Sequence, residues 1–442
     1  MASEWPEIQL GELVKRGEVT LQTGPFGSQL HKHDYIEHGV PVVPTEAIGR
    51  GLILSESVLP QITEKKATEL KRHALQRGDI LFARRGAQAT GLSAYVDDAH
   101  VGALCGTGAI LLRLRSAALD PKFLASFLAT NEAFEWLRAH AVGAVMPNLN
   151  TGIISQLAVP FPPLWVQREI GVTSSVIEHR IQLLRSQNTT LEAIAQALFK
   201  SWIADFDPVR AKAEGREPDG MDAATAALFP DSFEDSPLGP IPQGWQARSL
   251  DSIANYLNGL ALQKFPPESD DEFLPVIKIA QLRAGSTASA DRASARLKPE
   301  YVVHDGDVLF SWSGSLEVEF WCGGDGALNQ HLFKVTSTEV PKWFYYLATR
   351  QHLTMFRQIA ASKATTMGHI QRQHLTQAKV AVPPLPVLKA ATEIIEPLLD
   401  RRISNSLQMR QLVQLRDTLL PRLISGKLRL PDARTLIEEA TS

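Results

Sequence analysis

A polar turn bounded by glycines follows the apolar run at residues 80–82 and carries side chains suited to contact with nucleic acid. These side chains are Arg84, Arg85, Gln88 and Thr90. Arginine can donate two hydrogen bonds to guanine, glutamine can pair with adenine, and the main-chain amides of a tight turn can approach phosphates. An ordinary hairpin turn with solvated arginines explains the same residues equally well.

A second turn of this kind follows residues 308–310 and contributes Ser311, Trp312, Ser313 and Ser315. Three further polar segments are candidates for the same contact: Phe26, Gly27, Ser28 and Gln29; Asn148 and Asn150; and His369, Gln371 and Arg372. Asparagine between a strand and a helix is often only a helix cap, so that role stays open. Lys65 and Lys66 could attract phosphates or could line a solvated helix face.

Other combinations that could do chemistry are weaker. Three histidines and an aspartate lie within residues 31–38, but no second ligand cluster accompanies them, and a polar loop is the better interpretation. Cys105 and Cys322 are too few for a zinc site or a disulfide framework. We therefore expect two buried thiols and no metal site.

Motifs for catalysis do not occur in the sequence. It contains no Asn-Pro-Pro-aromatic tetrapeptide typical of DNA adenine methyltransferases and no phosphate-binding Gly-x-x-x-x-Gly-Lys-Ser/Thr loop. Gly106-Thr107-Gly108 is an isolated Gly-x-Gly. We expect no catalytic residues and no cofactor in this chain. Reading of nucleic acid, methyl transfer by the chain alone and scaffolding by coiled coils are the three functions to be separated.

The elements that must position these residues occur twice. Residues 78–82 (Gly-Asp-Ile-Leu-Phe) recur as residues 306–310 (Gly-Asp-Val-Leu-Phe), and residues 157–164 match residues 378–385. The second match continues at the same offset of 221 positions into the following segments. Because the matches keep a common order, they indicate an internal duplication.

Each copy begins with a mixed domain, at residues 1–164 and 244–385, in which short apolar runs alternate with glycine and proline turns. Strands are expected at 40–43, 80–82 and 110–112, and helical stretches at 121–140 and 341–360. The two domains are the predicted carriers of the polar turns.

A long helix is predicted after each domain, at residues 165–204 and 386–430. Both helices follow a Pro-Pro pair, and proline suits a helix start better than a helix interior. In the first helix, aliphatic residues recur every seven positions from Ile170 to Leu198, which is the seam of a coiled coil. Each helix could pack on its own domain, but an antiparallel pair between the two copies is the preferred interpretation.

The preferred pairing sets a register in which Asn188 faces Asn405. The same register pairs Leu184 with Met409, Ile181 with Leu412 and Leu198 with Ile395. Facing asparagines can satisfy each other and penalise slipped registers. The first helix would be ~50 Å long at ~1.5 Å per residue, more than the ~34 Å of one turn of duplex DNA.

Composition and charge fit a globular protein with a separate connecting segment. The 442 residues are 44% hydrophobic and 21% charged, with no apolar run of membrane-spanning length and no signal sequence at the start. Nine acidic and three basic residues lie between 204 and 240, so the rest of the chain is mildly basic although the total net charge is −3. We expect an acidic linker at 205–243 and a C-terminal tail at 431–442.

Several motifs resemble the specificity subunit of Type I restriction–modification systems. They are residues 23–28 (Thr-Gly-Pro-Phe-Gly-Ser), residues 78–86, the Pro-Pro-Leu junctions at 162–164 and 383–385, residues 197–209 (Ala-Leu-Phe-Lys-Ser-Trp leading to Asp-Phe-Asp-Pro-Val), and residues 415–426 (Leu-Arg-Asp-Thr-Leu-Leu-Pro-Arg-Leu-Ile-Ser-Gly). The resemblance covers essentially the whole chain, and the two helix-terminal motifs are the most specific. Val166-Gln167 and Val387-Leu388 depart from the Glu-Gln that the family often has after the junction.

The resemblance implies an α+β fold with two tandem α/β target recognition domains separated by an antiparallel pair of long coiled-coil helices, related by pseudo-two-fold symmetry. It implies a non-catalytic, cytoplasmic subunit whose domains each read one half of a bipartite duplex DNA site. The helices would set the spacing and dock two methyltransferase subunits, which restriction subunits join. S-adenosylmethionine, ATP and Mg would then act on the partner subunits.

Overall fold

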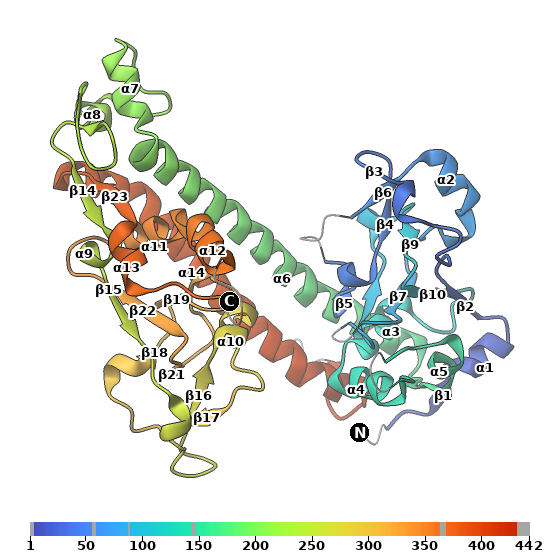
Figure 1. Ribbon diagram of the computed structural model, residues 1–442. Helices are drawn as coiled ribbons and strands as arrows, with labels where there is room; N and C mark the ends of the chain where they lie inside the picture. Colours follow the sequence, from blue (N-terminus) through green and yellow to red (C-terminus); the bar gives the residue numbers. More distant parts are fainter. Residues whose placement is uncertain (1–3, 55–58, 87–88, 144–146, 363–367, 431–442) are drawn as a thin grey trace. The chain divides into compact units, whose positions relative to one another are not determined.

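The computed structural model describes residues 4–54, 59–86, 89–143, 147–362 and 368–430 (Figure 1). The chain forms two compact units, Met1–Ile181 with Gln411–Ser442, and Gln182–Arg410. Each unit contains one mixed α/β domain and a segment of each long helix. The boundary between the units lies within the helices, so neither helix belongs to one domain alone.

The first unit contains a five-stranded sheet and a four-stranded sheet. The first has the order β2 (Val19–Thr23), β10 (Ala109–Leu114), β7 (Ile80–Ala83), β8 (Ser93–Tyr95) and β5 (Gly51–Leu52); the second has β3 (Tyr35–Ile36), β6 (Gln61–Ile62), β4 (Val40–Val43) and β9 (Leu104–Cys105). Strand β7 lies in the interior of its sheet with all four side chains buried, as expected for a short run of apolar residues without alternation.

The second unit repeats the centre of this arrangement in two four-stranded sheets, which differ from those of the first unit in their edge strands. Its sheets are β15 (Asn255–Asn258), β22 (Leu332–Thr336), β19 (Val308–Ser311) and β20 (Val318–Phe320), and β17 (Arg292–Ala293), β16 (Leu274–Ile277), β21 (Gly326–Leu328) and β18 (Val302–Val303). Strand β19 pairs with β22 and β20 in antiparallel fashion, as β7 pairs with β10 and β8. The duplication predicted from the sequence is therefore present in the fold.

Both predicted helical stretches form, and each divides into two helices. They are α3 (Pro121–Leu128) and α4 (Asn131–His140), and α11 (Lys342–Gln351) and α12 (Leu353–Ser362). Asp120 accepts hydrogen bonds at the start of α3 from the amides of Lys122 and Phe123. Thr130 ends this stretch and caps α4 through the amide of Ala133 at 3.3 Å. In the first stretch, a capping threonine in the middle is thus the reason for the division.

The remaining elements are short. The helices are α1 (Leu10–Lys15), α2 (Glu64–Glu69), α5 (Thr151–Gln156), α7 (Asp207–Ala213), α8 (Ala223–Ala227), α9 (Leu250–Ile253), α10 (Ile279–Ala284) and α13 (Arg372–Gln377). Three two-stranded pairs complete the fold: β1 (Glu7–Gln9) with β11 (Ala158–Pro160), β14 (Gln246–Ser249) with β23 (Lys379–Val382), and β12 (Phe233–Glu234) with β13 (Ile241–Pro242). No helix in the described part of the chain is long and apolar enough to cross a membrane.

The long helices are α6 (Leu164–Phe199) and α14 (Leu385–Ile424). In the second unit Asn405 donates a hydrogen bond to Asn188 Oδ1 at 3.0 Å, and Asn188 donates one to Ser406 at 3.0 Å. Asn405 is only 1% exposed. The structure thus places the two asparagines together, as the heptad register predicts, and the segments of α6 and α14 in this unit run antiparallel.

The first unit contains its own stretch of the same helix pairing. Arg416 donates a hydrogen bond to Glu178 at 2.6 Å. Burial by itself lowers the pKa of Arg416, but Glu178 and Asp417 raise it, and the net shift is upward. A buried guanidinium at this position therefore remains charged and paired.

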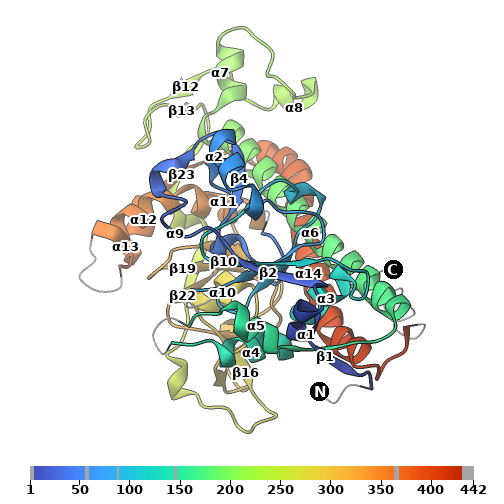
Figure 2. The ribbon, with the colours of Figure 1, turned by 90° about the vertical axis from the view of Figure 1, so that its right-hand side faces the viewer.

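Residues 205–243, predicted as an acidic linker, are folded and pack on the second unit. They form α7, α8 and the β12–β13 pair at the Phe199 end of α6 (Figure 2). Phe206 and Phe229 belong to the apolar core of this unit, and their rings lie 5.7 Å and 6.3 Å from that of Trp245. Burial of aromatic rings thus anchors an otherwise charged segment.

We predict that Asn405→Ala lowers the free energy of unfolding by about 1–3 kcal/mol, because a buried amide pair loses one partner. Urea denaturation followed by circular dichroism measures this change. Ser186→Ala, an exposed position on the same helix pair, is the matched control and should leave the midpoint unchanged. Equal midpoints for the two variants would show that the asparagine pair contributes nothing to stability.

Candidate nucleic-acid interface

The two polar turns are held by equivalent main-chain hydrogen bonds. In the first domain, the amide of Leu149 donates to Arg84 O at 2.8 Å, and in the second the amide of Ile370 donates to Trp312 O at 3.0 Å. These bonds join the turn after β7 or β19 to the segment before α5 or α13. Because the bonds involve no side chains, the same geometry accommodates different residues in the two domains.

The structure brings four residues of the first domain together, and we call Arg84, Arg85, Gly108 and Asn148 the first polar cluster. Arg84 donates through Nε to Asn148 Oδ1 at 2.9 Å, and its amide donates to Gly108 O at 2.9 Å. Arg85 and Asn148 form an isolated antiparallel bridge. Arg85 is exposed and makes no side-chain hydrogen bond or ion pair with the described residues, so its guanidinium can reach an external partner.

Backbone atoms form the base of the first polar cluster. A Cβ on Gly24 would lie 2.0 Å from Gly106 O, and one on Gly108 would lie 2.1 Å from Thr45 Oγ1. The second domain repeats the first of these approaches, since a Cβ on Gly259 would lie 2.3 Å from Asn329 O. Gly106 is thus required by close packing against the main chain, 2.4 Å from Val43 O, and Gly108 by close packing against the Thr45 side chain.

The second polar cluster consists of Trp312, Ser313, His331 and His369. The indole Nε1 of Trp312 donates to Asn258 Oδ1 at 3.0 Å and lies 3.1 Å from Gln330 O. Its ring lies 5.8 Å from that of His331 and 6.1 Å from that of His369. The single donor of the indole is therefore used internally, and the half-buried ring presents an apolar edge beside two imidazoles.

Equivalent positions of the two clusters carry different chemistry. Ser313 and His369 form the bridge that Arg85 and Asn148 form in the first domain. Ser313 Oγ lies 3.0 Å from His331 Nδ1. The first polar cluster offers a guanidinium and an amide, whereas the second offers an indole and imidazoles.

Three predicted contact residues, Thr90, Ser311 and Ser313, are buried in the turns themselves. Thr90 is 2% exposed and donates to Gly86 O at 2.8 Å. Ser311 is 0% exposed, donates to Ser315 O at 2.7 Å and accepts from the amide of Glu317 at 2.8 Å. The hydroxyls of Thr90 and Ser311 close the turns and do not face solvent. Gln88 lies outside the described residues, and Ser315 is exposed.

The predicted residues at the helix starts have structural partners. Asn150 accepts from the amide of Ile153 at 2.9 Å and caps α5. Gln371 occupies the corresponding position before α13. Arg372 donates to Tyr256 O at 3.1 Å, and its guanidinium lies 5.7 Å above the Phe333 ring. Capping, one of the two sequence interpretations, thus describes Asn150.

The remaining candidates lie in the loop at 26–29 and on α2. Phe26 is 56% exposed, Gly27 and Ser28 are exposed, and Gln29 accepts from the amide of Phe26 at 3.1 Å. Lys66 forms ion pairs with Asp34 at 3.7 Å and Glu69 at 3.6 Å, while Lys65 is exposed. These residues are not part of either polar cluster.

The repeated Gly-Asp pair has a structural role that the sequence did not indicate. Asp79 accepts from the amide of Gln76 at 2.7 Å, and Asp307 accepts from that of His304 at 2.8 Å. Asp79 also pairs with Arg113 at 2.6 Å, and this hydrogen bond raises the pKa of Arg113. The aspartates shape the turns that lead into β7 and β19 and so fix where each polar cluster begins.

Sequence reasoning missed His331, Asn258 and Gln330 in the second polar cluster. Their signal was positional, because residues 329–331 precede β22 as residues 106–108 precede β10. Both cysteines are free thiols; Cys105 is buried as expected, but Cys322 is only half-buried, and burial raises the pKa of Cys105 to about 12 and that of Cys322 to about 11. Neither thiol ionises near neutral pH.

Comparison with known proteins supplies a family for this arrangement. The profile described as "Type I restriction modification DNA specificity domain" matches residues 2–193 and 242–412. The Type I restriction enzyme HindI specificity subunit of Haemophilus influenzae is 24% identical over 410 residues, which covers 81% of this chain and 88% of that protein. The MjaIX specificity subunit of Methanocaldococcus jannaschii is 22% identical over 379 residues, with 84% and 82% covered.

A solved structure has the same fold. The crystal structure of a Type I restriction–modification S subunit from M. genitalium superposes with a TM-score of 0.55 at 16% identity, and the superposition covers 95% of this chain and 96% of that one. This similarity concerns the fold alone. The roles of the side chains in the two polar clusters must be inferred from the residues of this chain.

We predict that Gly24→Ala destabilises the first domain by about 1–3 kcal/mol, the cost of forcing an extra carbon into a packed site. Thermal unfolding monitored by circular dichroism measures the loss. Gly27→Ala is the control three residues away, where an added Cβ meets nothing within 4 Å. If both variants unfolded at the wild-type temperature, the close approach of Gly24 to Gly106 would be irrelevant to stability.

Proposed function

The chain belongs to the family of Type I restriction–modification DNA specificity subunits, and from this membership we propose that its two domains read two different halves of one bipartite duplex site. The observation that carries the proposal is the chemistry of the two polar clusters. Equivalent main-chain bonds hold both turns, yet their side chains differ at each facing position. Two readers on one scaffold are suited to two dissimilar half-sites.

The first polar cluster is suited to a half-site that contains guanine. Arg85 is exposed, and an arginine fork matches the O6 and N7 acceptors of guanine in the major groove. Arg84 is fixed by Asn148, which leaves the Asn148 amide group as a donor toward adenine or a phosphate. The cluster therefore combines one exposed guanidinium with one amide that is held by an internal hydrogen bond.

The second polar cluster is suited to a half-site read by apolar contact. The indole of Trp312 has its N–H bonded inside the protein, so its edge can contact a thymine methyl group. His331 and His369 lie beside the indole and can bond to base edges or phosphates. No arginine occupies the position that Arg85 has in the first cluster.

The helices are proposed to set the spacing of the half-sites and to dock two methyltransferase subunits, which restriction subunits join. Helix α6 has 36 residues, a length of ~54 Å at ~1.5 Å per residue. Trp165, Val172 and Val176 are 66%, 52% and 57% exposed and fall at helical spacing on one face. Exposed apolar residues in such a row are typical of a partner surface.

Methyl transfer and DNA translocation are then properties of the partners. S-adenosylmethionine, ATP and Mg are proposed to bind there, and the adenine to be methylated is flipped into the methyltransferase pocket. This chain reads the DNA sequence and sets the distance from it at which the methyltransferase pocket is placed. We propose that the assembly acts in the cytoplasm.

We predict that Arg85→Ala and Trp312→Ala each relax discrimination at one half-site only, by about 1–3 kcal/mol for the contacted base. The chain is assembled with its methyltransferase partners and titrated in mobility-shift assays against duplexes with one half-site scrambled at a time. These titrations measure the discrimination at each half-site separately. Mapping of methylated adenines in the host genome identifies the target DNA sequence.

Arg115→Ala is the matched control for this experiment, because it removes one charge from an exposed position of the first domain outside the polar cluster. It should weaken binding slightly and equally for all duplexes. Methyl transfer by the isolated chain, or binding without any preferred bipartite sequence and without salt dependence, would contradict the proposed function.

A further inference from the structure

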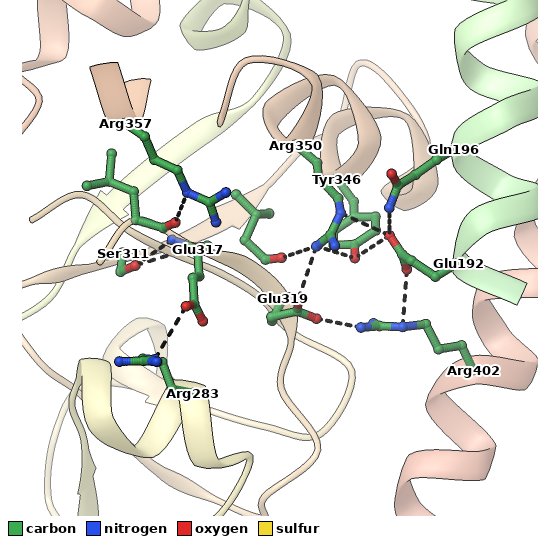
Figure 3. Close-up of polar contacts among 12 residues, drawn as sticks. Glu192, Gln196, Arg283, Ser311, Glu317, Glu319, Tyr346, Arg350, Arg357 and Arg402 are labelled. Carbon is green, nitrogen blue, oxygen red and sulfur yellow. Dashed lines mark hydrogen bonds and ion pairs between the residues drawn. The ribbon is translucent and has the colours of Figure 1, made fainter. Parts of the chain in front are cut away.

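Four charged side chains of the second unit form a closed ring of ion pairs (Figure 3). Arg350 contacts Glu192 at 3.1 Å and Glu319 at 3.0 Å, and Arg402 contacts Glu319 at 2.5 Å and Glu192 at 3.1 Å. The two contacts with Glu319 are hydrogen bonds, whereas the two with Glu192 are ion pairs outside hydrogen-bond geometry. We call Glu192, Glu319, Arg350 and Arg402 the charge ring.

The charge ring joins the second domain to both long helices. Glu192 lies on α6, Arg402 on α14, Arg350 on α11 and Glu319 on β20. Tyr346 and Gln196 add hydrogen bonds to Glu192 at 3.0 Å and 2.8 Å. A second tie lies two helical turns along α14, where Arg410 pairs with Asp305 at 2.8 Å.

The ring is also connected to the polar turn of the second domain. Arg350 donates to Val318 O at 3.0 Å, directly after the turn that leads from β19 to β20. Arg357 donates to Leu316 O in the same turn at 3.0 Å (Figure 3). The polar turn thus rests on groups that are held, through Arg350, by the helix pair.

The first copy of the repeat has no charge ring. The duplication places uncharged residues at all four positions: Val413 for Glu192, Ala94 for Glu319, Thr130 for Arg350 and Ile181 for Arg402. The first domain attaches to its helix segments through apolar residues such as Leu419 and Leu423, and through the buried Gln167. The scaffold thus forms in the first copy without such a ring, and in the second copy the ring accompanies an apolar core that also joins the domain to the helices.

A partly buried ring of charges is suited to fixing one geometry. Replacement of buried ion pairs by apolar residues is often neutral or stabilising, so stability alone does not require the ring. Burial by itself lowers the pKa of Arg402, but Tyr346, Glu319 and Glu192 raise it, and the net shift is upward. The hydrogen bonds of two guanidinium groups are directional, unlike apolar contacts, and they are satisfied in one orientation of the domain on the helices.

We propose that the charge ring holds the second domain in one orientation on the helix pair and thereby determines which DNA spacer length the protein accepts. The inference rests on the proposed function, since it assumes that two half-sites are read together. One added base pair moves a half-site by ~3.4 Å along the duplex and turns it by ~35° about the axis. A domain that cannot rotate on its helices rejects such a site.

The test uses Glu319→Gln, which removes one charge from the ring and keeps the shape of the side chain. The complex with the methyltransferase subunits is given duplexes whose half-sites are separated by the native spacer or by one base pair more or fewer, and incorporation of labelled methyl groups is measured. We expect the ratio of native to altered spacers to fall about tenfold, the effect of losing one hydrogen bond between charged groups. Base discrimination within each half-site should stay at the wild-type level.

Two further variants keep the test decisive. Arg292→Gln breaks the exposed ion pair with Asp270 in the same domain and should leave the spacer ratio unchanged. The fourfold variant Glu192→Met, Glu319→Leu, Arg350→Met and Arg402→Met replaces the charge ring by apolar side chains, a change that usually preserves folding. It provides the test if the single variant fails to assemble. It should accept altered spacers at least as well as Glu319→Gln.

An unchanged spacer ratio in the assembled ring variants would overturn the inference, as would loss of base discrimination at the second half-site with unchanged spacer choice. The latter would show that the ring serves the polar turn alone. If the wild-type complex itself showed no preference for a bipartite site, the proposed function would fail before the ring was tested. The two failures are therefore distinguishable.

Discussion

The main-chain hydrogen bonds that join each polar turn to the segment before α5 or α13 are the contacts on which the candidate interface depends. Leu149 donates to Arg84 O, and Ile370 donates to Trp312 O, with nearly the same length. Such bonds are indifferent to side-chain identity. One scaffold can therefore display a guanidinium in the first domain and an indole in the second without any change of fold.

The duplicated scaffold is attached to the long helices in two different ways. Both domains pack on the helices through an apolar core, to which the first domain adds one buried amide and the second adds the charge ring. Apolar contact stabilises without strong directional preference, and a ring of ion pairs specifies direction at some cost in desolvation. The asymmetry suggests that the two domains are subject to different demands on orientation, which the repeat alone does not explain.

Much of the architecture could be predicted from local patterns in the sequence. The repeat, strands such as Val40–Val43, the helices after the Pro-Pro pairs and the meeting of Asn188 with Asn405 follow from periodicity and spacing. The charge ring could not be predicted, because its partners lie far apart in the sequence, on four different elements. The inward direction of the hydroxyls of Thr90 and Ser311 depends on turn geometry that composition does not reveal. The bases that the clusters read depend on the shape of the DNA as well as on the side chains. The sequence of one chain therefore does not predict them.

The backbone packing beneath the first polar cluster has a consequence for how such a protein can change over generations. Gly24, Gly106 and Gly108 supply the base of the cluster with main-chain atoms, and the exposed side chain of Arg85 contributes little to folding. Substitutions at exposed positions usually alter stability by less than ~0.5 kcal/mol. A lineage can therefore acquire a new preference by single replacements without compensating changes in the interior, so that diversity of targets accumulates while the fold stays constant.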